Sequence, residues 1–375
     1  MADSRYPSAR EIAPRLAERF AAYRAVTAAL GPTHPIVPSA EDIEAVIDAA
    51  FWASLRREEN YLPRISLALL PAELAAQPVR FDRPLPLSSV ALVKVAPAVE
   101  RRGIHLGVWR DQGALRVWGT TRVVPVSSMV LEVAAPGLLV IKHHRGDGGK
   151  YVNVAVLEAD RVKMISDRAT AQPDCPALVT TLLGYEGPGW KSQLTVLVEL
   201  AVSMRAHGRG GTMLIVPSDS AWRESIVQPI PYEINPAYTG LASLVARSDA
   251  DRGRREWQDE MEETVRAVAG LTAVDGATLI TDRYDLLAFG AKIGRRHGSP
   301  SVEQTTVTEP VEDNEAAVVH PSALGGTRHL SAAQFVHDQH DGMALVASQD
   351  GRFTIFGWSP CEKMVHAHRV ETLLL

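Results

Sequence analysis

The sequence predicts an α/β protein of two domains, in which a C-terminal domain with a central mixed sheet flanked by helices follows an α+β, β-rich N-terminal domain. Three observations support this prediction. The chain has 375 residues, which is long for one domain and sufficient for two. Strand-like runs dominate the middle of the first half, whereas strand-like and helix-like segments alternate in the second half. Residues 168–190 are rich in turn formers, so we expect domains at 1–187 and 188–375.

The first 75 residues are expected to be mostly helical. Ser39 precedes an apolar series with helical spacing, and Glu41 and Asp42 fall in its first turn, where acidic side chains complement the helix dipole. The apolar members of the series are Ile43, Val46, Ile47, Ala50, Phe51 and Leu55. This pattern is typical of a helix that packs against a core, and we expect no catalytic role for it.

Residues 86–166 have the pattern of a compact β-rich module. Asp111-Gln112-Gly113 lies between two apolar runs that contain tryptophan, which predicts a β-hairpin. The further strand-like runs are Val123–Val126, Met129–Val133, Leu138–Ile141 and Val152–Leu157. We expect these strands to form a sheet with the N-terminal helices on one face.

The second half begins with a predicted helix over 191–206 and a short buried strand over 212–216. Further helices are expected near 236–247 and over 254–270, and the acidic residues of the latter are most simply a solvated face. The remaining expected elements are strands at 274–280, 286–291, 343–348 and 352–356, with an irregular polar connection at 294–318. Strands and helices mixed in this way predict a mixed central sheet.

The bulk composition argues against several classes of protein. A net charge of -5 does not suit a protein that coats nucleic acid, because such domains are usually strongly basic. No apolar run approaches the roughly 18–20 residues of a membrane span, and the N-terminus has no apolar signal core. The two cysteines, Cys175 and Cys361, supply neither a disulfide framework nor a zinc-ligand spacing. We therefore expect a cytoplasmic protein with no membrane and no nucleic-acid partner.

The segment Gly325–Phe335 carries the strongest chemical signal in the chain. Its two glycines permit a sharp turn and a close approach of the backbone to a ligand. Polar side chains then lie where a helix is predicted to begin; they are Thr327, Arg328, His329 and Ser331. Free N–H groups and the positive end of a helix dipole suit phosphate, and a guanidinium donates to the same oxygens. The alternative is a surface turn with an ordinary helix cap.

A second fragment lies about fifty residues upstream. Asp275 is expected at the entry to a strand, beside a glycine that permits close approach, and Ser348 is expected at the end of another strand. A carboxylate that can hold a divalent cation, next to a cradle for phosphates, is the minimum equipment for nucleotidyl transfer. In that chemistry the enzyme mainly positions groups and neutralises charge.

In this order the motifs resemble the diadenylate cyclase (DAC) domain family, whose members join two ATP molecules into cyclic di-AMP. The resemblance covers about residues 190–358 and rests on Asp275-Gly276-Ala277, on Gly326-Thr327-Arg328-His329 and on Ala347-Ser348-Gln349-Asp350-Gly351. The first motif alone is weak and the second is moderately specific, but both in this order are a strong signal. The region 1–185 resembles the sensor domains found ahead of some bacterial DAC domains, which implies a regulatory role and a small-molecule or protein signal.

The resemblance implies that Asp275 binds the catalytic metal, Mg²⁺ or Mn²⁺, and helps to activate the 3′-hydroxyl of ATP. It implies catalytic roles for Arg328 and His329 as well, and makes His329 a second metal ligand. The residues implied in nucleotide binding are Gly276, Ala277, Gly326, Thr327, Arg328, Ser331 and Ser348. In this family each domain holds one ATP and two domains face each other, so a homo-oligomer is implied and a lone monomer would be inactive.

Three departures from the family pattern bear on activity. Leu330 stands where the family usually has a second arginine, which removes a charge-assisted contact worth roughly 1.5–3 kcal/mol. Gln349 replaces an acidic residue, although Asp350 is adjacent, and the segment 248–272 is longer than usual. Two interpretations stay open, an active cyclase or a catalytically impaired nucleotide-binding regulatory protein. A third is an unrelated α/β protein in which Asp275 is only a turn residue.

Overall fold

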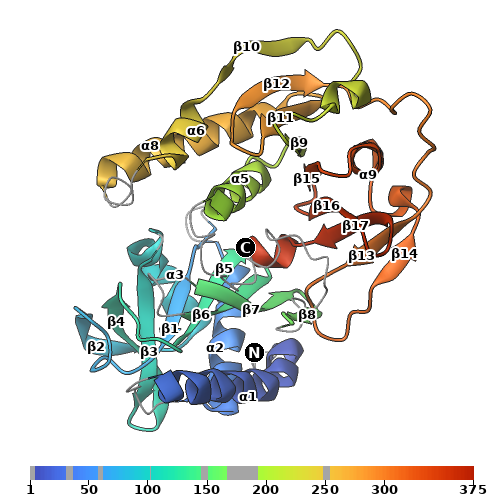
Figure 1. Ribbon diagram of the computed structural model, residues 1–375. Helices are drawn as coiled ribbons and strands as arrows, with labels where there is room; N and C mark the ends of the chain where they lie inside the picture. The colour runs from blue at the N-terminus through green and yellow to red at the C-terminus, as the bar shows by residue number, and fades with distance from the viewer. Residues whose placement is uncertain are drawn as a thin grey trace. The chain divides into compact units, whose positions relative to one another are not determined.

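The computed structural model describes residues 5–30, 37–57, 62–101, 103–144, 151–166, 193–247 and 254–375. The chain divides into two compact units: unit 1 is Met1–Ile165 with Leu375, and unit 2 is Ser166–Leu374. Each unit has its own mixed sheet with helices (Figure 1), so the expected α/β class is confirmed. The expected boundary at residues 187–188 lies outside the described residues.

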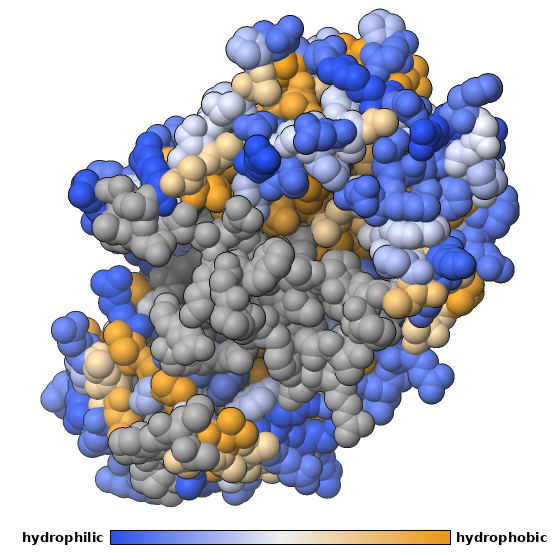
Figure 2. Space-filling model, viewed as in Figure 1, coloured by the Kyte–Doolittle hydropathy of each residue, from blue (hydrophilic) through white to orange (hydrophobic). Residues whose placement is uncertain are grey.

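The described surface is mostly hydrophilic in the view of Figure 2, with apolar residues lying between hydrophilic ones. Large exposed apolar side chains of the described residues are spread over both units; among them are Val79 in unit 1 and Val318 in unit 2. None of the described helices combines the length and the apolar composition that crossing a membrane requires.

Unit 1 is built on an eight-stranded sheet in the order β2-β4-β3-β1-β5-β6-β7-β8. β1 pairs with β3 in parallel, and the other neighbours pair antiparallel. Successive side chains of a strand point to opposite faces, so Leu67 and Leu69 enter the large core while Ala68 enters a smaller core on the other face. The strands are β1 (Ser66–Leu69), β2 (Val79–Pro86), β3 (His105–Asp111), β4 (Ala114–Thr121), β5 (Met129–Ala135), β6 (Leu138–His144), β7 (Tyr151–Glu158) and β8 (Arg161–Met164).

Three helices cover the face of this sheet that holds the large core (Figure 1). They are α1 (Pro7–Leu30), α2 (Ala40–Ser54) and α3 (Ser89–Val95), which the 3₁₀ turn η1 (Ala96–Val99) follows. α2 begins where the sequence predicts, because the hydroxyl of Ser39 accepts the N–H of Asp42 at 3.1 Å. Most of its apolar stripe is buried as expected, and Ile43, Ile47 and Ala50 are fully inaccessible to solvent; Leu55, the residue after the helix, is exposed instead.

Unit 2 is built on a nine-stranded sheet in the order β10-β12-β11-β9-β15-β16-β17-β13-β14. β11 pairs with β9 and β13 pairs with β17 in parallel, while the other neighbours pair antiparallel. The strands are β9 (Gly211–Val216), β10 (Tyr232–Tyr238), β11 (Ala277–Thr281), β12 (Leu286–Ala291), β13 (Thr305–Thr308), β14 (Ala317–Val319), β15 (Met343–Ala347), β16 (Phe353–Ser359) and β17 (Met364–Arg369).

Helices lie on both sides of the centre of this sheet. α9 (Thr327–Asp338) packs through Ala332, Phe335 and Val336 against β9, β15, β16 and β17. α5 (Gln193–Ala206) contacts β15, and α8 (Arg255–Gly270) packs on α5 (Figure 1). The other helical elements are α6 (Gly240–Val245), η3 (Trp222–Ser225), η4 (Leu271–Ala273), η5 (Pro321–Ala323) and η6 (Glu371–Leu373).

One strand of unit 1 was not expected, and one expected strand is wrong. Residues 66–69, inside the region expected to be mostly helical, form strand β1, because a short apolar run buried on both faces suits a central strand as well as a helix. Val123–Val126 makes only an isolated bridge to Ala76, since Pro125 cannot donate a ladder hydrogen bond. The expected hairpin at Asp111-Gln112-Gly113 is present between β3 and β4.

Three expectations for unit 2 are also wrong. Strand β10 takes up the first residues of the helix expected near 236–247, because Pro236 disfavours a helical residue before it, and only α6 remains. The stretch 294–318, expected to be irregular, contains β13 and the start of β14; the threonines of β13 hide its apolar alternation, and β14 is only three residues long. β17 was not expected, since His366 and His368 interrupt its apolar pattern.

Candidate functional site

Three adjacent strands in the middle of the unit 2 sheet have ends that lie side by side. In the order β11-β9-β15, the start of β11 lies beside the start of β9, where Gly211 pairs with Ala347 at the end of β15. Asp275 lies two residues before β11, and Ser348 follows β15 directly. The topology therefore places two of the predicted segments on either side of β9.

Arg328, in the first turn of α9, reaches these strand ends. A Cβ atom added at Gly210 would lie 2.9 Å from Nη1 of Arg328. The same atom would lie 3.2 Å from the carbonyl oxygen of Ala347 and 3.3 Å from Cγ of Gln349. Gly210 also has a φ of +69°, which side chains rarely adopt. The start of α9, the turn before β9 and the end of β15 thus meet around one guanidinium group.

Asp275 is exposed and forms an ion pair with Lys292. The hydrogen bond and the positive charge of Lys292 lower the pKa of the Asp275 carboxyl, and the charge of Arg328 lowers it further. Asp275 is therefore ionised at neutral pH. Because the guanidinium of Arg328 acts on this pKa, the acidic motif and the helix start share one electrostatic environment.

Lys292 was missed by the sequence analysis. It follows β12, the hairpin partner of β11, and the pairing of Ala277 with Ala291 brings it beside Asp275. The register of this hairpin is the signal that could have found Lys292, because it places the residue after Ala291 opposite the residues that precede Ala277.

The glycine and alanine that follow Asp275 are both enclosed by the fold. Gly276 has a φ of +113°, and a Cβ atom there would lie 2.4 Å from the carbonyl carbon of Gly290. The neighbouring strand therefore accounts for this glycine without a ligand. Ala277 is buried in the core under α9. A nucleotide could contact these two residues only through their backbone.

The start of α9 has no side-chain cap. Its N-cap residue is Gly326, whose φ is -73°, and no acidic residue lies in the first turn. A Cβ atom added at Gly326 would find no atom within 4 Å, and Thr327 is exposed. No N-cap side chain therefore accepts the first N–H groups of α9, which suits an anion at the positive end of its dipole, although the N–H of His329 already donates to the carbonyl oxygen of Gly326 at 3.1 Å.

His329 is buried between Gly325 and Phe356. A Cβ atom at Gly325 would lie 2.5 Å from Nδ1 of the ring, and the ring centroids of His329 and Phe356 are 6.1 Å apart. Burial lowers the pKa of His329, so its imidazole is neutral at pH 7. Among the described residues, Nε2 of His329 is buried and has no hydrogen-bond partner. A neutral imidazole is the form that binds metals.

Ser331 and Leu330 line a cavity of about 460 Å³ beside α9. Residues of the connection 293–303, His320 and Gln334 of α9 form the rest of its wall. The buried carboxylate of Asp338, at the end of α9, holds this connection in place, because it accepts the N–H of Arg296 at 2.9 Å. The cavity lies in the size range of small-molecule sites, which is roughly 300–1,000 Å³.

The end of β15 carries an ionised carboxylate at Asp350. Burial alone would raise the pKa of Asp350, but a hydrogen bond from Ser348 and contacts with Arg352 lower it overall. The charge of Asp350 in turn acts on His329. Gln349, one of the departures from the family pattern, donates a hydrogen bond from Nε2 to the carbonyl oxygen of Arg209 at 3.3 Å, so it supports the turn before β9.

The side chains present fit a metal ion that arrives with a nucleotide. Within the described ranges, no three His, Cys, Asp or Glu side chains are grouped to hold a metal ion by themselves. Mg²⁺ commonly takes one or two carboxylates and completes its shell with phosphate oxygens and water. Asp275 supplies one such carboxylate, exposed and ionised.

Residues 33–122 match the family model described as "Probable sensor domain DACNV", the N-terminal sensor domain of DAC proteins. No curated protein matches the sequence. The matched stretch runs from just before α2 to just after β4, within unit 1. The similarity therefore concerns unit 1, whereas the candidate site lies in unit 2.

Proposed function

We propose that the chain is a diadenylate cyclase, in which unit 2 condenses two ATP molecules into cyclic di-AMP and pyrophosphate and unit 1 regulates it. The observations that support this proposal are that Arg328 lies beside Gly210 and the end of β15, at the uncapped start of α9, and that the charge of Arg328 helps to lower the pKa of Asp275. The similarity of residues 33–122 to a sensor domain of DAC proteins supports it independently.

In the proposed reaction, the 3′-hydroxyl oxygen of each ATP attacks the α-phosphorus of the other. The bond from the α-phosphorus to the oxygen that bridges it to the β-phosphate breaks, and pyrophosphate leaves with the electron pair. The proton of each 3′-hydroxyl passes to solvent. Two such steps give the cyclic dinucleotide and two pyrophosphates. Because negative charge builds up on phosphate oxygens, groups that neutralise it lower the barrier.

The proposed roles follow from the positions of the side chains. Arg328 and Thr327, with the first N–H groups of α9 after Gly326, hold the triphosphate. Ser348 donates from the end of β15, and Ser331 does so from the cavity beside α9, which would hold the nucleoside. Asp275 orients the 3′-hydroxyl and binds Mg²⁺ or Mn²⁺. The metal, when bound, neutralises charge on the triphosphate.

The neutral Nε2 of His329 would add a hydrogen-bonding or metal-binding group to these proposed site residues.

Each unit 2 would hold one ATP, so two copies of the chain must face each other for either hydroxyl to reach an α-phosphate. Product formation should therefore rise more steeply than in proportion to protein concentration at low concentration.

A catalytically impaired nucleotide-binding regulatory protein is the second candidate function. The observations that favour it are Leu330 in the cavity wall, where the family usually has arginine, and the ion pair that Lys292 makes with Asp275. Such a protein would bind ATP saturably in calorimetry and form no product.

A product assay tests the proposal. The full chain, incubated at high concentration with Mn²⁺ and either ATP or GTP, should give a cyclic dinucleotide from ATP that chromatography separates. Asp275→Ala should abolish product and leave the melting temperature unchanged. Asp282→Ala is the matched control, because Asp282 is a carboxylate just after β11, at its opposite end, where it accepts a hydrogen bond from Ser218. Full activity of Asp275→Ala would contradict the proposal.

A further inference from the structure

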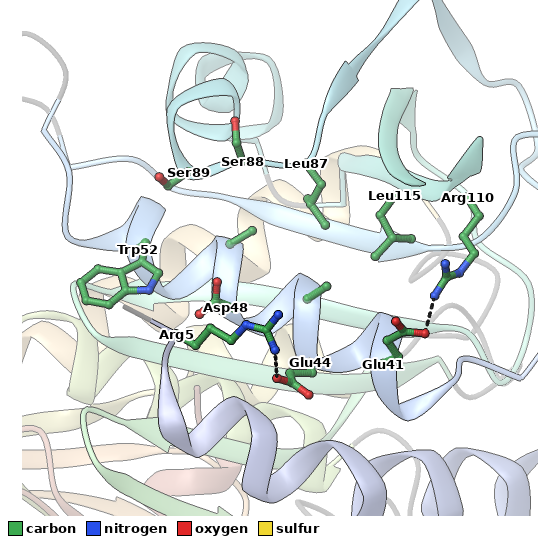
Figure 3. A pocket seen from close by; sticks show the side chains of 12 residues that line it. Arg5, Glu41, Glu44, Asp48, Trp52, Leu87, Ser88, Ser89, Arg110 and Leu115 are labelled. Atoms are coloured by element: carbon green, nitrogen blue, oxygen red, sulfur yellow. Dashed lines mark hydrogen bonds and ion pairs between the residues drawn. The ribbon is translucent and has the colours of Figure 1, made fainter. Parts of the chain in front are cut away.

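A cavity of about 470 Å³ lies in unit 1 (Figure 3). One face of α2 forms one wall, and the facing wall comes from Leu87–Ser89 before and at the start of α3 and from Arg110 and Leu115 of the β3–β4 hairpin. Except for Arg5, the lining residues lie between positions 41 and 115. The cavity therefore falls within the stretch that is similar to a sensor domain.

A row of carboxylates runs along the α2 wall. Glu41, Glu44 and Asp48 line the cavity at spacings of three and four residues, which puts them on one face of the helix. At a rise of 1.5 Å per residue, the steps along the row are about 4.5 Å and about 6 Å. Figure 3 shows the three side chains in line beneath the opposite wall.

Other groups of the chain contact each carboxylate of this row, and Asp48 accepts the backbone N–H of Tyr6 at 2.7 Å. Arg110 lies 3.1 Å from Glu41, and Arg5 lies 3.7 Å from Glu44, as the dashed lines in Figure 3 mark. The Arg5 side chain is 84% exposed, whereas the Glu44 side chain is only 26% exposed. Because exposed ion pairs contribute little to stability, a diffusible cation can displace Arg5 from Glu44 at small cost.

The rest of the lining is partly apolar. Leu87 and Leu115 point toward α2 from the opposite side (Figure 3), where Ser88 and Ser89 also line the cavity. Ala45 and Ala49 of α2 line it beside the carboxylates. Trp52 closes the α2 wall, and among the described residues its buried indole N–H has no hydrogen-bond partner. An aliphatic chain with separated positive charges matches this alternation, and the ring of Trp52 offers a cation–π contact at one end.

The charge of the lining favours a cation, because three carboxylates face only two arginines, Arg5 and Arg110. The carboxylates are spread along the helix, about 4.5 Å and about 6 Å apart, so separated positive charges fit them better than a single ion does. We propose that this cavity is a ligand site for a linear aliphatic polyamine, a triamine with a three-carbon and a four-carbon spacer. The proposal does not depend on the activity of unit 2.

Calorimetry with the full chain and spermidine tests this site. The wild-type protein should bind one spermidine saturably, and Mg²⁺ at equal ionic strength should not compete. Glu44→Gln should weaken binding by about tenfold, because it removes the carboxylate whose own partner, Arg5, is exposed and easily displaced. Glu73→Gln is the matched control: it removes the same charge from unit 1 at an exposed ion pair with Arg80 and should leave binding unchanged.

Leu115→Ala provides a second test that leaves the charge of the row intact. It should weaken spermidine binding by about threefold, because part of the apolar wall is lost. Equal melting temperatures of the variants would show that each is folded. Absence of saturable binding to the wild type, or equal losses in Glu44→Gln and Glu73→Gln, would overturn the proposal.

Discussion

The starts of α2 in unit 1 and α9 in unit 2 differ in how their free N–H groups are used. At α2, the hydroxyl of Ser39 accepts an N–H, acidic residues fill the first turn, and Arg110 covers them, lying 2.7 Å from Asp42. At α9, Gly326 supplies no cap, the first turn has no acid, and Arg328 adds positive charge. A helix start closed by its own chain stabilises the fold, whereas an open and positive one is suited to an anionic ligand.

The largest expected effect contrasts Gly276, which packs against Gly290, with Gly326 at the open start of α9. Gly276→Ala should lower the free energy of unfolding of unit 2 by about 2–4 kcal/mol, because a Cβ atom meets the backbone of Gly290 at a positive φ. Gly326→Ala should cost less than about 1 kcal/mol, since nothing lies within 4 Å and φ is negative. Urea denaturation measures both. If the two variants lost similar free energies of unfolding, Gly276 would not be fixed by packing any more than Gly326 is.

A second effect distinguishes His105 of unit 1, whose ring nitrogens are both hydrogen-bonded, from His329, whose buried Nε2 has no hydrogen-bond partner among the described residues. Both nitrogens of His105 have partners, Ser66 at 2.7 Å and Tyr151 at 3.1 Å. Burial lowers the pKa of His105 to about 4, below its unfolded value of about 6.5. The unfolded chain binds the proton first as pH falls, so unit 1 should lose up to about 3 kcal/mol of stability between pH 6.5 and pH 4.

His105→Gln keeps a hydrogen-bonding side chain but removes this titration. Urea denaturation at several pH values should show a flatter dependence over this range for the variant than for the wild-type protein. An unchanged slope would mean that other groups set the acid sensitivity of unit 1.

The smallest expected effect is at the closed helix start itself. Ser39→Ala should lower the free energy of unfolding of unit 1 by about 1 kcal/mol, because the N–H of Asp42 loses its acceptor. Thermal denaturation measures it, and ATP binding should not change. A variant as stable as the wild type would show that α2 does not depend on its cap.

The sequence predicted the parts of the candidate site that are local in the chain. The turn before β11 and the start of α9 are each a short motif, and their elements form where the spacing predicts. The role of Gly210 beside Arg328 could not be predicted, because it depends on the order β11-β9-β15. The cavity of unit 1 has no motif at all, since Arg5, α2 and the β3–β4 hairpin meet only in the fold.

Asp275 and Arg328 are proposed to act on one bound ATP, and a double-mutant cycle tests this most directly. Calorimetry with ATP and Mn²⁺ would compare the wild type with Asp275→Asn, Arg328→Gln and the double variant. We predict that the losses of binding free energy in the two single variants, added together, exceed the loss in the double variant by about 1 kcal/mol or more, because both side chains contact the same triphosphate. Strictly additive losses, or ATP binding that neither substitution weakens, would contradict the proposed site.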